Sequence, residues 1–370
     1  MGKVVNIAAI GVGVFMARKH LPNMAANPAI RIHTLCDLDE ALLDKRAEEF
    51  SPLRTTTNAD TVFDDPDIDA VVVGTRGREH ARFVIQAAQH GKHIYVEKPM
   101  THTLDETRAV LEAVSGADIQ VGVGFNRRYA PIMKAAKARF HGYKSGPANL
   151  LYRIVDDHRI RPEYVFDLAD GGGHLLAEGC HIFDLIAWFL EAEPVEVYAV
   201  GPLETDNAVI LTLSDESTAV LLCGGKGGLC YPKECMEVFC DHRTLVMDSL
   251  FEMRFDGPGE NFLRTYPPRP ARGPALEQDN MTGFYRARFA ARPAEDLTGP
   301  HAANHLPFPA TDHGHDRAIR AFAEAVVSGA PYGMSAIDGA RATVCALKAY
   351  ESIRTRAPVA IRPEEYGLKA

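Results

Sequence analysis

Short apolar runs alternate with helical stretches over the first 122 residues, and this alternation constrains the fold more than any other feature. The runs that read as strands lie at residues 4–10, 30–36, 70–73, 91–96 and 120–124. Stretches with helical spacing lie between them, as at 38–50 and 80–90. Strands that alternate with helices are typical of a parallel, doubly wound sheet. We therefore predict an α/β domain over residues 1–123.

The pattern changes after residue 124. A helix at 132–140 precedes six longer apolar runs between residues 148 and 247, which read as a mostly antiparallel sheet. One helix interrupts them at about 174–190, so we predict a second, α+β domain over 124–370 with a large open sheet. Residues 256–313 are rich in Pro and Gly, with little periodicity. We expect an irregular insertion there, either a lid or assembly arm or a plain surface insertion.

Composition limits the kinds of binding partner that the protein can have. The 370-residue chain has a net charge of -9, and a generally acidic surface argues against nucleic acid or an anionic membrane as the main partner. No apolar run approaches the ~20 residues that span a bilayer, and the first residues lack a signal-peptide pattern, so we expect a cytoplasmic protein. The seven cysteines, with Cys230, Cys235 and Cys240 evenly spaced, complete no ligand set, and we expect core thiols and no metal.

A glycine turn follows the first strand and indicates a dinucleotide site. Gly11-Val12-Gly13 opens the first helix, and Asp37 ends the second strand. Glycines there let backbone N–H groups approach a pyrophosphate, as in the Rossmann fold, although Met16 stands where a third Gly or Ala is usual. A carboxylate at the second strand end accepts hydrogen bonds from ribose hydroxyls and repels a 2′-phosphate, so the predicted cofactor is NAD.

The tripeptide Glu97-Lys98-Pro99 directly follows the strand 91–96. Strand tips are where α/β sheets bind ligands, and Glu and Lys are seldom buried without a reason. Proline after the lysine restricts the backbone and permits a cis peptide bond. The alternative is an ordinary surface ion pair before a turn.

A second polar cluster lies on the helix that follows Gly171-Gly172-Gly173. His174, Glu178 and His181 are four and three residues apart, which places them on one face of a regular helix. Oxidation of an alcohol by a nicotinamide needs a base for the hydroxyl proton and a cation for the developing alkoxide. We predict that Lys98 and His181 supply these groups, with the substrate in the cleft between the domains. The alternative is that Glu178 and His181 simply pair with each other.

These motifs, in this order, resemble the Gfo/Idh/MocA oxidoreductases. Thr75-Arg76 with His80, and the segment 124–131, are similar to one branch of that family. The resemblance implies NAD(P)-dependent oxidation or reduction of a sugar, sugar derivative or cyclitol, with Lys98 and His181 matching the catalytic lysine and histidine. It also implies a homodimer or homotetramer, associated through the open face of the second sheet. The candidate cofactor-binding residues are Gly11, Gly13, Val14, Phe15, Asp37, Thr75, Arg76, His80, Glu97, Lys98 and Asn126.

One position departs from the family pattern. The family has an aspartate four residues before the histidine, where this chain has Ala177, and Glu178 is the next residue. Either Lys98 and His181 act alone, or Glu178 orients His181 from the side.

The remaining site candidates concern the substrate. They are Arg127, Tyr129, Arg153, His158, His174 and His181. Arginines favour an anionic carbohydrate, but cofactor binding or a structural ion pair is the better explanation of any single one of them. Two activities stay open: a dehydrogenase, and an NAD-dependent glycoside hydrolase. The hydrolase would oxidise its substrate transiently, cleave it by elimination, add water and return the hydride, for example on an anionic sulfoquinovoside.

Overall fold

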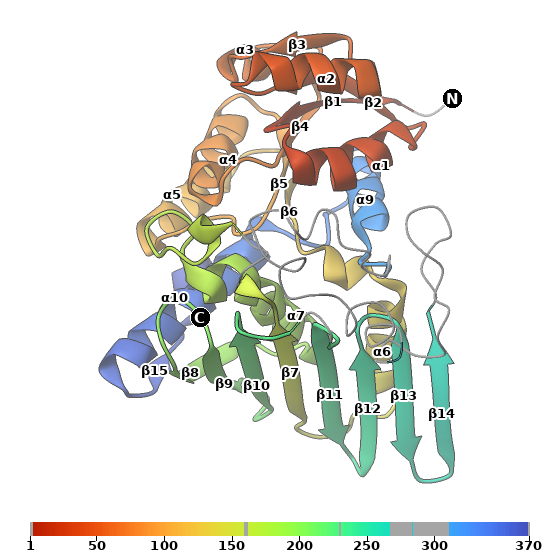
Figure 1. Cartoon of the computed structure of the whole chain (residues 1–370), viewed down its shortest axis with the longest axis vertical. Helices are drawn as coiled ribbons and strands as arrows, with labels where there is room; N and C mark the ends of the chain where they lie inside the picture. The colour runs from red at the N-terminus through yellow and green to blue at the C-terminus, as the bar shows by residue number, and fades with distance from the viewer. Residues whose placement is uncertain (1–2, 159–161, 229–230, 267–282, 284–310, 369–370) are drawn as a thin grey trace. The chain divides into compact units, whose positions relative to one another are not determined.

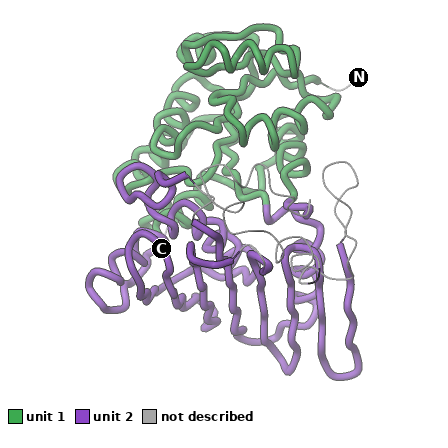
Figure 2. Tube along the Cα trace, in the orientation of Figure 1, with its two compact units in different colours: residues 1–126, 314–344, 364–370 green, residues 127–313, 345–363 purple. Residues whose placement is uncertain are grey.

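The computed structural model describes residues 3–158, 162–228, 231–266, 283 and 311–368. Figure 2 shows that the chain forms two compact units. Unit 1 contains residues 1–126, 314–344 and 364–370, and unit 2 contains residues 127–313 and 345–363. Residues 314–344 and 364–370, which the sequence placed with the second domain, thus belong to the first unit. Helix α10 (Ala336–Thr355) continues from unit 1 into unit 2.

Unit 1 is built on a parallel sheet. In the described residues its six strands run in the order β3-β2-β1-β4-β5-β6, and every neighbouring pair is parallel. This is the strand order of a dinucleotide-binding Rossmann sheet, so the α/β prediction is confirmed. The strands are β1 (Val5–Ile10), β2 (Ile30–Cys36), β3 (Arg54–Thr56), β4 (Ala70–Val73), β5 (His93–Val96) and β6 (Val121–Val123).

Helices cover both faces of this sheet (Figure 1). Helix α4 (His80–Gln89) packs on β4 and β5, and α5 (Leu104–Val114) packs on α4. Helix α1 (Leu21–Ala25) and helix α9 (His315–Ser328) pack together, and α9 also contacts β1. The buried face of α9 therefore explains why a late segment belongs to the first unit. Two further helices follow β2 and β3, namely α2 (Glu40–Phe50) and α3 (Asp60–Phe63).

Unit 2 is built on a mostly antiparallel sheet, as predicted. In the described part, nine strands run in the order β14-β13-β12-β11-β7-β10-β9-β8-β15, and only β7 and β10 pair in parallel. The strands are β7 (Asn149–Val155), β8 (Pro194–Val200), β9 (Asn207–Leu213), β10 (Thr218–Gly224), β11 (Glu234–Cys240), β12 (Arg243–Asp248), β13 (Glu252–Gly257), β14 (Glu260–Thr265) and β15 (Val359–Ala360).

The prediction of an irregular segment from residue 256 was wrong at its start. Strand β14 (Glu260–Thr265) pairs with β13 and lies inside it. Its sequence is mostly polar and solvent-exposed, so it carries no apolar alternation to mark it as a strand. Residues 267–282 and 284–310, the bulk of the expected lid or arm, lie outside the described residues.

The two faces of the unit 2 sheet differ. Helix α6 (Pro131–His141) packs on β12 and β13, and the turn before α7 (Cys180–Leu190) packs on β10. Strand residues alternate accordingly: Tyr152 is fully buried, whereas Leu151 is 39% exposed. The register places Leu151 beside Val220 and Val220 beside Ile210, so half-exposed apolar side chains adjoin one another across three strands. Among the described helices, none combines the length and the apolar character needed to cross a membrane.

Candidate active site

The predicted cofactor residues of unit 1 gather at one edge of its sheet. Strands β1, β2, β4, β5 and β6 end at Ile10, Cys36, Val73, Val96 and Val123. Because the strands are parallel, the segments that follow them meet at the same, carboxyl edge, where open α/β sheets bind their ligands. Ten of the eleven predicted cofactor residues lie within five residues after one of these strand ends, and His80 begins the helix α4 that follows β4.

The glycine turn is shaped by close approach to the loop after β4. Gly11 has φ +80°, and a Cβ atom on it would come within 2.8 Å of Thr75 and 2.9 Å of the Gly74 backbone. Only glycine suits this position. A Cβ on Gly13, by contrast, would meet nothing within 4 Å, so the outer side of the turn is open. This arrangement fits a dinucleotide, whose pyrophosphate would be held by the backbone N–H groups of the turn.

Asp37 is tied to the same turn. Its Oδ2 accepts a hydrogen bond from the Val12 N–H at 2.8 Å, and Arg46 Nε donates to the Val12 carbonyl at 3.2 Å. The carboxylate thus lies beside the glycine turn, as the prediction of ribose recognition requires. Met16, the departure from the usual glycine pattern, is fully buried, and a Cβ on Gly74 would lie 2.9 Å from its Cε atom. The absence of a side chain at Gly74 therefore leaves space for the Met16 side chain, at a position where the usual pattern has a small residue in the helix.

His80 lies at the tips of β4 and β5. Its Nδ1 is 2.7 Å from the Pro99 carbonyl oxygen and its Nε2 is 3.2 Å from that of Thr75. Burial lowers the pKa of His80 below its ordinary value, against the opposing effect of the Pro99 carbonyl. The ring lies between the loop that carries Thr75 and the loop that carries Lys98, and in its neutral form it donates to one of these two carbonyls. Val14 and Phe15, at the glycine turn, are 47% and 44% exposed.

The Lys98–Pro99 peptide bond is cis, as the proline predicted. Lys98 itself is half-buried, and its backbone N–H donates to Glu97 Oε2 at 3.3 Å. The other carboxylate oxygen of Glu97 lies 2.7 Å from His20 Nε2. Sequence reasoning missed His20, because a histidine in an amphipathic helix gives no sign of a partner 77 residues away. Asn126 is buried shortly after β6.

In unit 2, the helix that carries His181 begins irregularly. Residues Leu175–Gly179 form a π-helical turn, and α7 follows from Cys180. The contacts of His174 and Glu178 differ, although the sequence predicts that they share a helix face. His174 is buried near Thr205 Oγ1 (3.2 Å) and Cys223 Sγ (3.7 Å). Burial raises the pKa of the Cys223 thiol, which disfavours its thiolate form.

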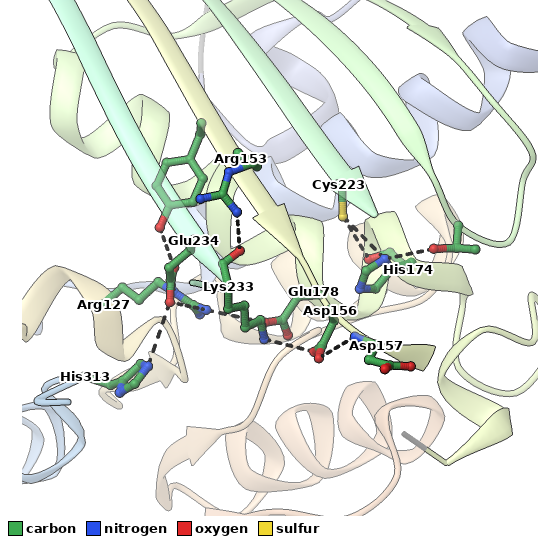
Figure 3. A network of polar contacts seen from close by, with 12 residues as sticks. Arg127, Arg153, Asp156, Asp157, His174, Glu178, Cys223, Lys233, Glu234 and His313 are labelled. Carbon is green, nitrogen blue, oxygen red and sulfur yellow. Dashed lines mark hydrogen bonds and ion pairs between the residues drawn. The ribbon is translucent and has the colours of Figure 1, made fainter. Parts of the chain in front are cut away.

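Glu178 lies in a network of charges instead (Figure 3). Its Oε1 is 2.7 Å from Lys233 Nζ and 3.3 Å from Arg127 Nη2. Lys233 also lies 3.2 Å from Asp156 Oδ2. His181 is buried two residues into α7. The orienting role predicted for Glu178 stays a prediction.

Arg127 and Glu234 form the buried centre of this network. Arg127 Nε donates to Glu234 Oε2 at 2.9 Å, and the Tyr152 hydroxyl donates to the same oxygen at 2.5 Å. Burial alone would lower the pKa of Arg127, but Glu234 and Glu178 outweigh it and raise that pKa above its usual range. For Glu234, burial acts to raise the pKa, and Arg127, His313 and Lys233 overcome it and lower that pKa below its ordinary value.

Sequence reasoning missed Lys233, Glu234 and Asp156. Of these three, only Glu234 could have been noticed in the sequence. It is a charged residue at the start of an apolar strand, at a position that the alternating pattern directs toward the core. Its partners on other elements cannot be inferred from such a signal, because they are brought together only by the fold.

The other predicted substrate residues have varied surroundings. Arg153 Nη1 donates to the Pro232 carbonyl at 2.7 Å, and its guanidinium lies 4.8 Å from the Tyr231 ring centroid. His158 is exposed, with its Nδ1 2.9 Å from the Gly225 carbonyl oxygen. Tyr129 lies under the ammonium of Lys134, at 4.5 Å from the ring centroid. Substrate binding by these residues stays a prediction.

A neighbouring arginine also has an acidic partner. Arg128, next to Arg127, donates from Nε to Asp184 Oδ2 at 2.8 Å and from Nη2 to Oδ1. Asp184 lies three residues after His181 on α7, and both partners of this pair are buried. The arginines at 127, 128 and 153 thus all contact acceptors or rings of unit 2.

Comparison with known proteins agrees with this geometry. Residues 5–125 match the model of the oxidoreductase family with an NAD-binding Rossmann fold, Gfo/Idh/MocA. An uncharacterized oxidoreductase of Bacillus subtilis, YrbE, is 29% identical over 221 residues, 60% of this chain and 64% of that protein. Myo-inositol 2-dehydrogenase of Thermotoga maritima is 27% identical over 222 residues, 60% of this chain and 65% of its own length. Each match therefore spans less than two thirds of the relative.

Solved structures share the fold over nearly the whole chain. An oxidoreductase domain protein from Kribbella flavida has a TM-score of 0.78 at 20% identity, covering 97% of this chain and 100% of that one. A levoglucosan dehydrogenase in complex with NADH and levoglucosan has a TM-score of 0.77 at 20% identity, covering 97% and 99%.

Proposed function

The chain is a member of the Gfo/Idh/MocA oxidoreductase family, and on that premise we propose that it transfers a hydride between a nicotinamide cofactor and a hydroxyl-bearing carbon of a neutral sugar or cyclitol. The main support for this proposal is that all eleven candidate cofactor residues follow the carboxyl ends of neighbouring parallel strands. Relatives named as inositol 2-dehydrogenases and a levoglucosan dehydrogenase support the substrate class.

In the proposed reaction, one side chain removes the hydroxyl proton of the substrate and another stabilises the negative charge that develops on its oxygen. The nicotinamide, when bound, accepts the hydride. Lys98, at the tip of β5, stabilises the developing alkoxide with its ammonium group, and His181, on α7, takes the hydroxyl proton. Asp37 accepts hydrogen bonds from the adenosine ribose, and its charge favours NAD over NADP.

The partners of Arg127 and Arg128 support a neutral substrate. An anion needs a guanidinium whose charge is available to it. Arg127 contacts two carboxylates and Arg128 contacts a third, so the charges of both are balanced by unit 2 itself. Hydroxyl groups, by contrast, are recognised by mixed donors and acceptors such as Lys233 and Glu178, which are partly exposed.

The proposed assembly uses the open face of the unit 2 sheet. Leu151, Val220 and Ile210 adjoin across β7, β10 and β9 and are 38–46% exposed. A row of apolar side chains on a sheet face is typical of a protein interface. We propose that a second copy of this chain covers it.

One experiment tests the activity. The enzyme is mixed with NAD or NADP and a panel of inositols, levoglucosan, aldoses, a uronate and aryl glycosides. Stoichiometric NADH from a neutral polyol supports the proposal. Turnover of the uronate alone would contradict the neutral substrate. Release of the aryl group without accumulation of NADH would show instead the NAD-dependent glycoside hydrolase, which shares the oxidation step but returns the hydride.

A further inference from the structure

His20 is a buried titratable group that the proposed chemistry does not use. It ends the π-helical turn Met16–His20 after the glycine loop, and it is 1% exposed. Its Nε2 lies 2.7 Å from Glu97 Oε1, and the Glu97 side chain is itself only 9% exposed. A carboxylate buried to this degree needs a donor, and the imidazole N–H supplies one.

The second ring nitrogen indicates which tautomer is present. Within the described residues, His20 Nδ1 has no hydrogen-bond partner. A buried N–H without an acceptor costs free energy, so the proton of a neutral ring lies on Nε2, facing Glu97. His20 is therefore a donor to Glu97.

Glu97 is held on two further sides. Its Oε2 accepts from the Lys98 backbone N–H at 3.3 Å. A Cβ atom on Gly124, directly after β6, would lie 2.8 Å from both carboxylate oxygens, so the carboxylate rests against bare backbone. The carboxylate position is thus fixed by His20, by the turn that carries Lys98, and by Gly124.

Aromatic rings enclose the His20 side of this contact. The ring centroids of Tyr95, Phe15 and His315 lie 5.4, 5.6 and 6.3 Å from that of His20. Phe15 is a candidate cofactor residue, and Tyr95 lies on β5, two residues before Glu97. His20 therefore connects the glycine turn to the strand tip that carries Lys98.

We propose that His20 is a positioning residue, which acts through Glu97 to fix the backbone from which the Lys98 side chain projects. The inference rests on the proposed function for its meaning, because a fixed Lys98 matters only where its ammonium must meet a reacting oxygen. Small displacements of a reacting group lower turnover steeply, by about 100-fold for 1 Å.

Two substitutions at His20 separate the effect of its hydrogen bond to Glu97 from the effect of its ring packing. His20→Gln keeps an N–H near the position of Nε2, whereas His20→Phe keeps the ring and removes the donor. His33→Phe is the matched control. His33 is a buried histidine of the same unit, 4% exposed, whose Nδ1 lies 2.9 Å from Thr34 Oγ1 and 4.0 Å from Asp65 Oδ2.

The first measurement is amide hydrogen exchange at Lys98 in the cofactor-free protein. We expect faster exchange in His20→Phe and wild-type exchange in His20→Gln and His33→Phe. The second measurement is steady-state kinetics. We expect kcat to fall about 10- to 100-fold in His20→Phe, with the KM for the polyol little changed, and to recover in His20→Gln.

Wild-type exchange and kcat in His20→Phe would overturn the inference. An equal loss of kcat in His20→Gln would also overturn it, because it would show that the ring contributes packing alone. If His20→Phe does not fold, Gly124→Ala displaces the same carboxylate with His20 intact. The same losses in that variant support the inference, and wild-type behaviour overturns it. If the wild type turns over no substrate, the proposed function alone fails, because the exchange measurement still decides what His20 does.

Discussion

The ammonium of Lys233 lies 2.7 Å from the carboxylate of Glu178, in the π-helical turn that precedes the helix of His181. Arg127 contacts the same oxygen at 3.3 Å, so Glu178 faces two cations. Lys233 and Arg127 thus share the Glu178 carboxylate. This pairing supports the proposal that the substrate offers hydroxyl groups and carries no charge.

Lys98→Ala is expected to lower kcat by about 10²- to 10⁴-fold, because the developing alkoxide loses its cation. The Kd for NAD should stay near the wild-type value, since the glycine turn and Asp37 are untouched. Steady-state kinetics and titration calorimetry measure the two effects. Lys45→Ala, at an exposed lysine of α2, is the control and should behave as wild type. A wild-type kcat in Lys98→Ala would show that the lysine is structural.

Asp37→Asn is expected to weaken the preference for NAD over NADP by about tenfold, or about 1.4 kcal/mol. The amide oxygen still accepts from the Val12 N–H, so the turn keeps its shape, while the charge that repels a 2′-phosphate is gone. The ratio of kcat/KM for the two cofactors measures the change. Asp39→Asn is the control, because Asp39 caps α2 two residues further on. An unchanged ratio in Asp37→Asn would mean that another group selects the cofactor.

Glu234→Gln is expected to lower the free energy of unfolding at neutral pH by about 3 kcal/mol, because buried Arg127 loses a charged partner. The pKa of Glu234 is lower in the folded chain than its ordinary value of 4.5. Its contribution is therefore complete above that value and is lost as the pH falls through the folded pKa. Urea unfolding at a series of pH values should show the two proteins converging in acid.

Glu237→Gln provides the comparison for that series, since Glu237 lies on the same strand and is half-exposed. It should change the free energy of unfolding by less than about 0.5 kcal/mol. If the difference in unfolding free energy between Glu234→Gln and the wild type persists at low pH, the loss of stability comes from altered packing and not from the lost charge.

Val220→Glu is expected to dissociate the proposed assembly, since it places a charge in the apolar row on the open sheet face. Light scattering coupled to size-exclusion chromatography measures the mass. Leu53→Glu, at a 63% exposed leucine of unit 1, should leave the mass unchanged. A wild type that is monomeric at all concentrations would contradict the assembly.

The parallel sheet and the nucleotide turn were predictable because local signals carry them. Apolar runs such as Ala70–Val73 are buried on both faces, and the glycines of the turn are adjacent in the chain. Strand β3, with the sequence Arg-Thr-Thr, and β14 gave no such signal, because both are exposed and polar. Their pairing depends on neighbouring strands that are already in place.

The charged groups of the site were only partly predictable. Lys98 and His181 stood out by type and position. The partners of Glu178 and Glu97 lie on other elements, 55 residues away for Lys233 and 77 for His20, and only the fold brings them together. The π-helical turn was also unpredictable, since residues 174–181 satisfy the spacing of an ordinary helix.

Helix α9 has a consequence for how the chain is made. It covers β1, yet it is synthesised after every strand of the second sheet except β15. The part of the first sheet that α9 covers therefore stays exposed until nearly the whole chain has been translated. Chaperones that shield apolar surface have their longest window at this face, and fragments that stop before residue 315 should aggregate through it.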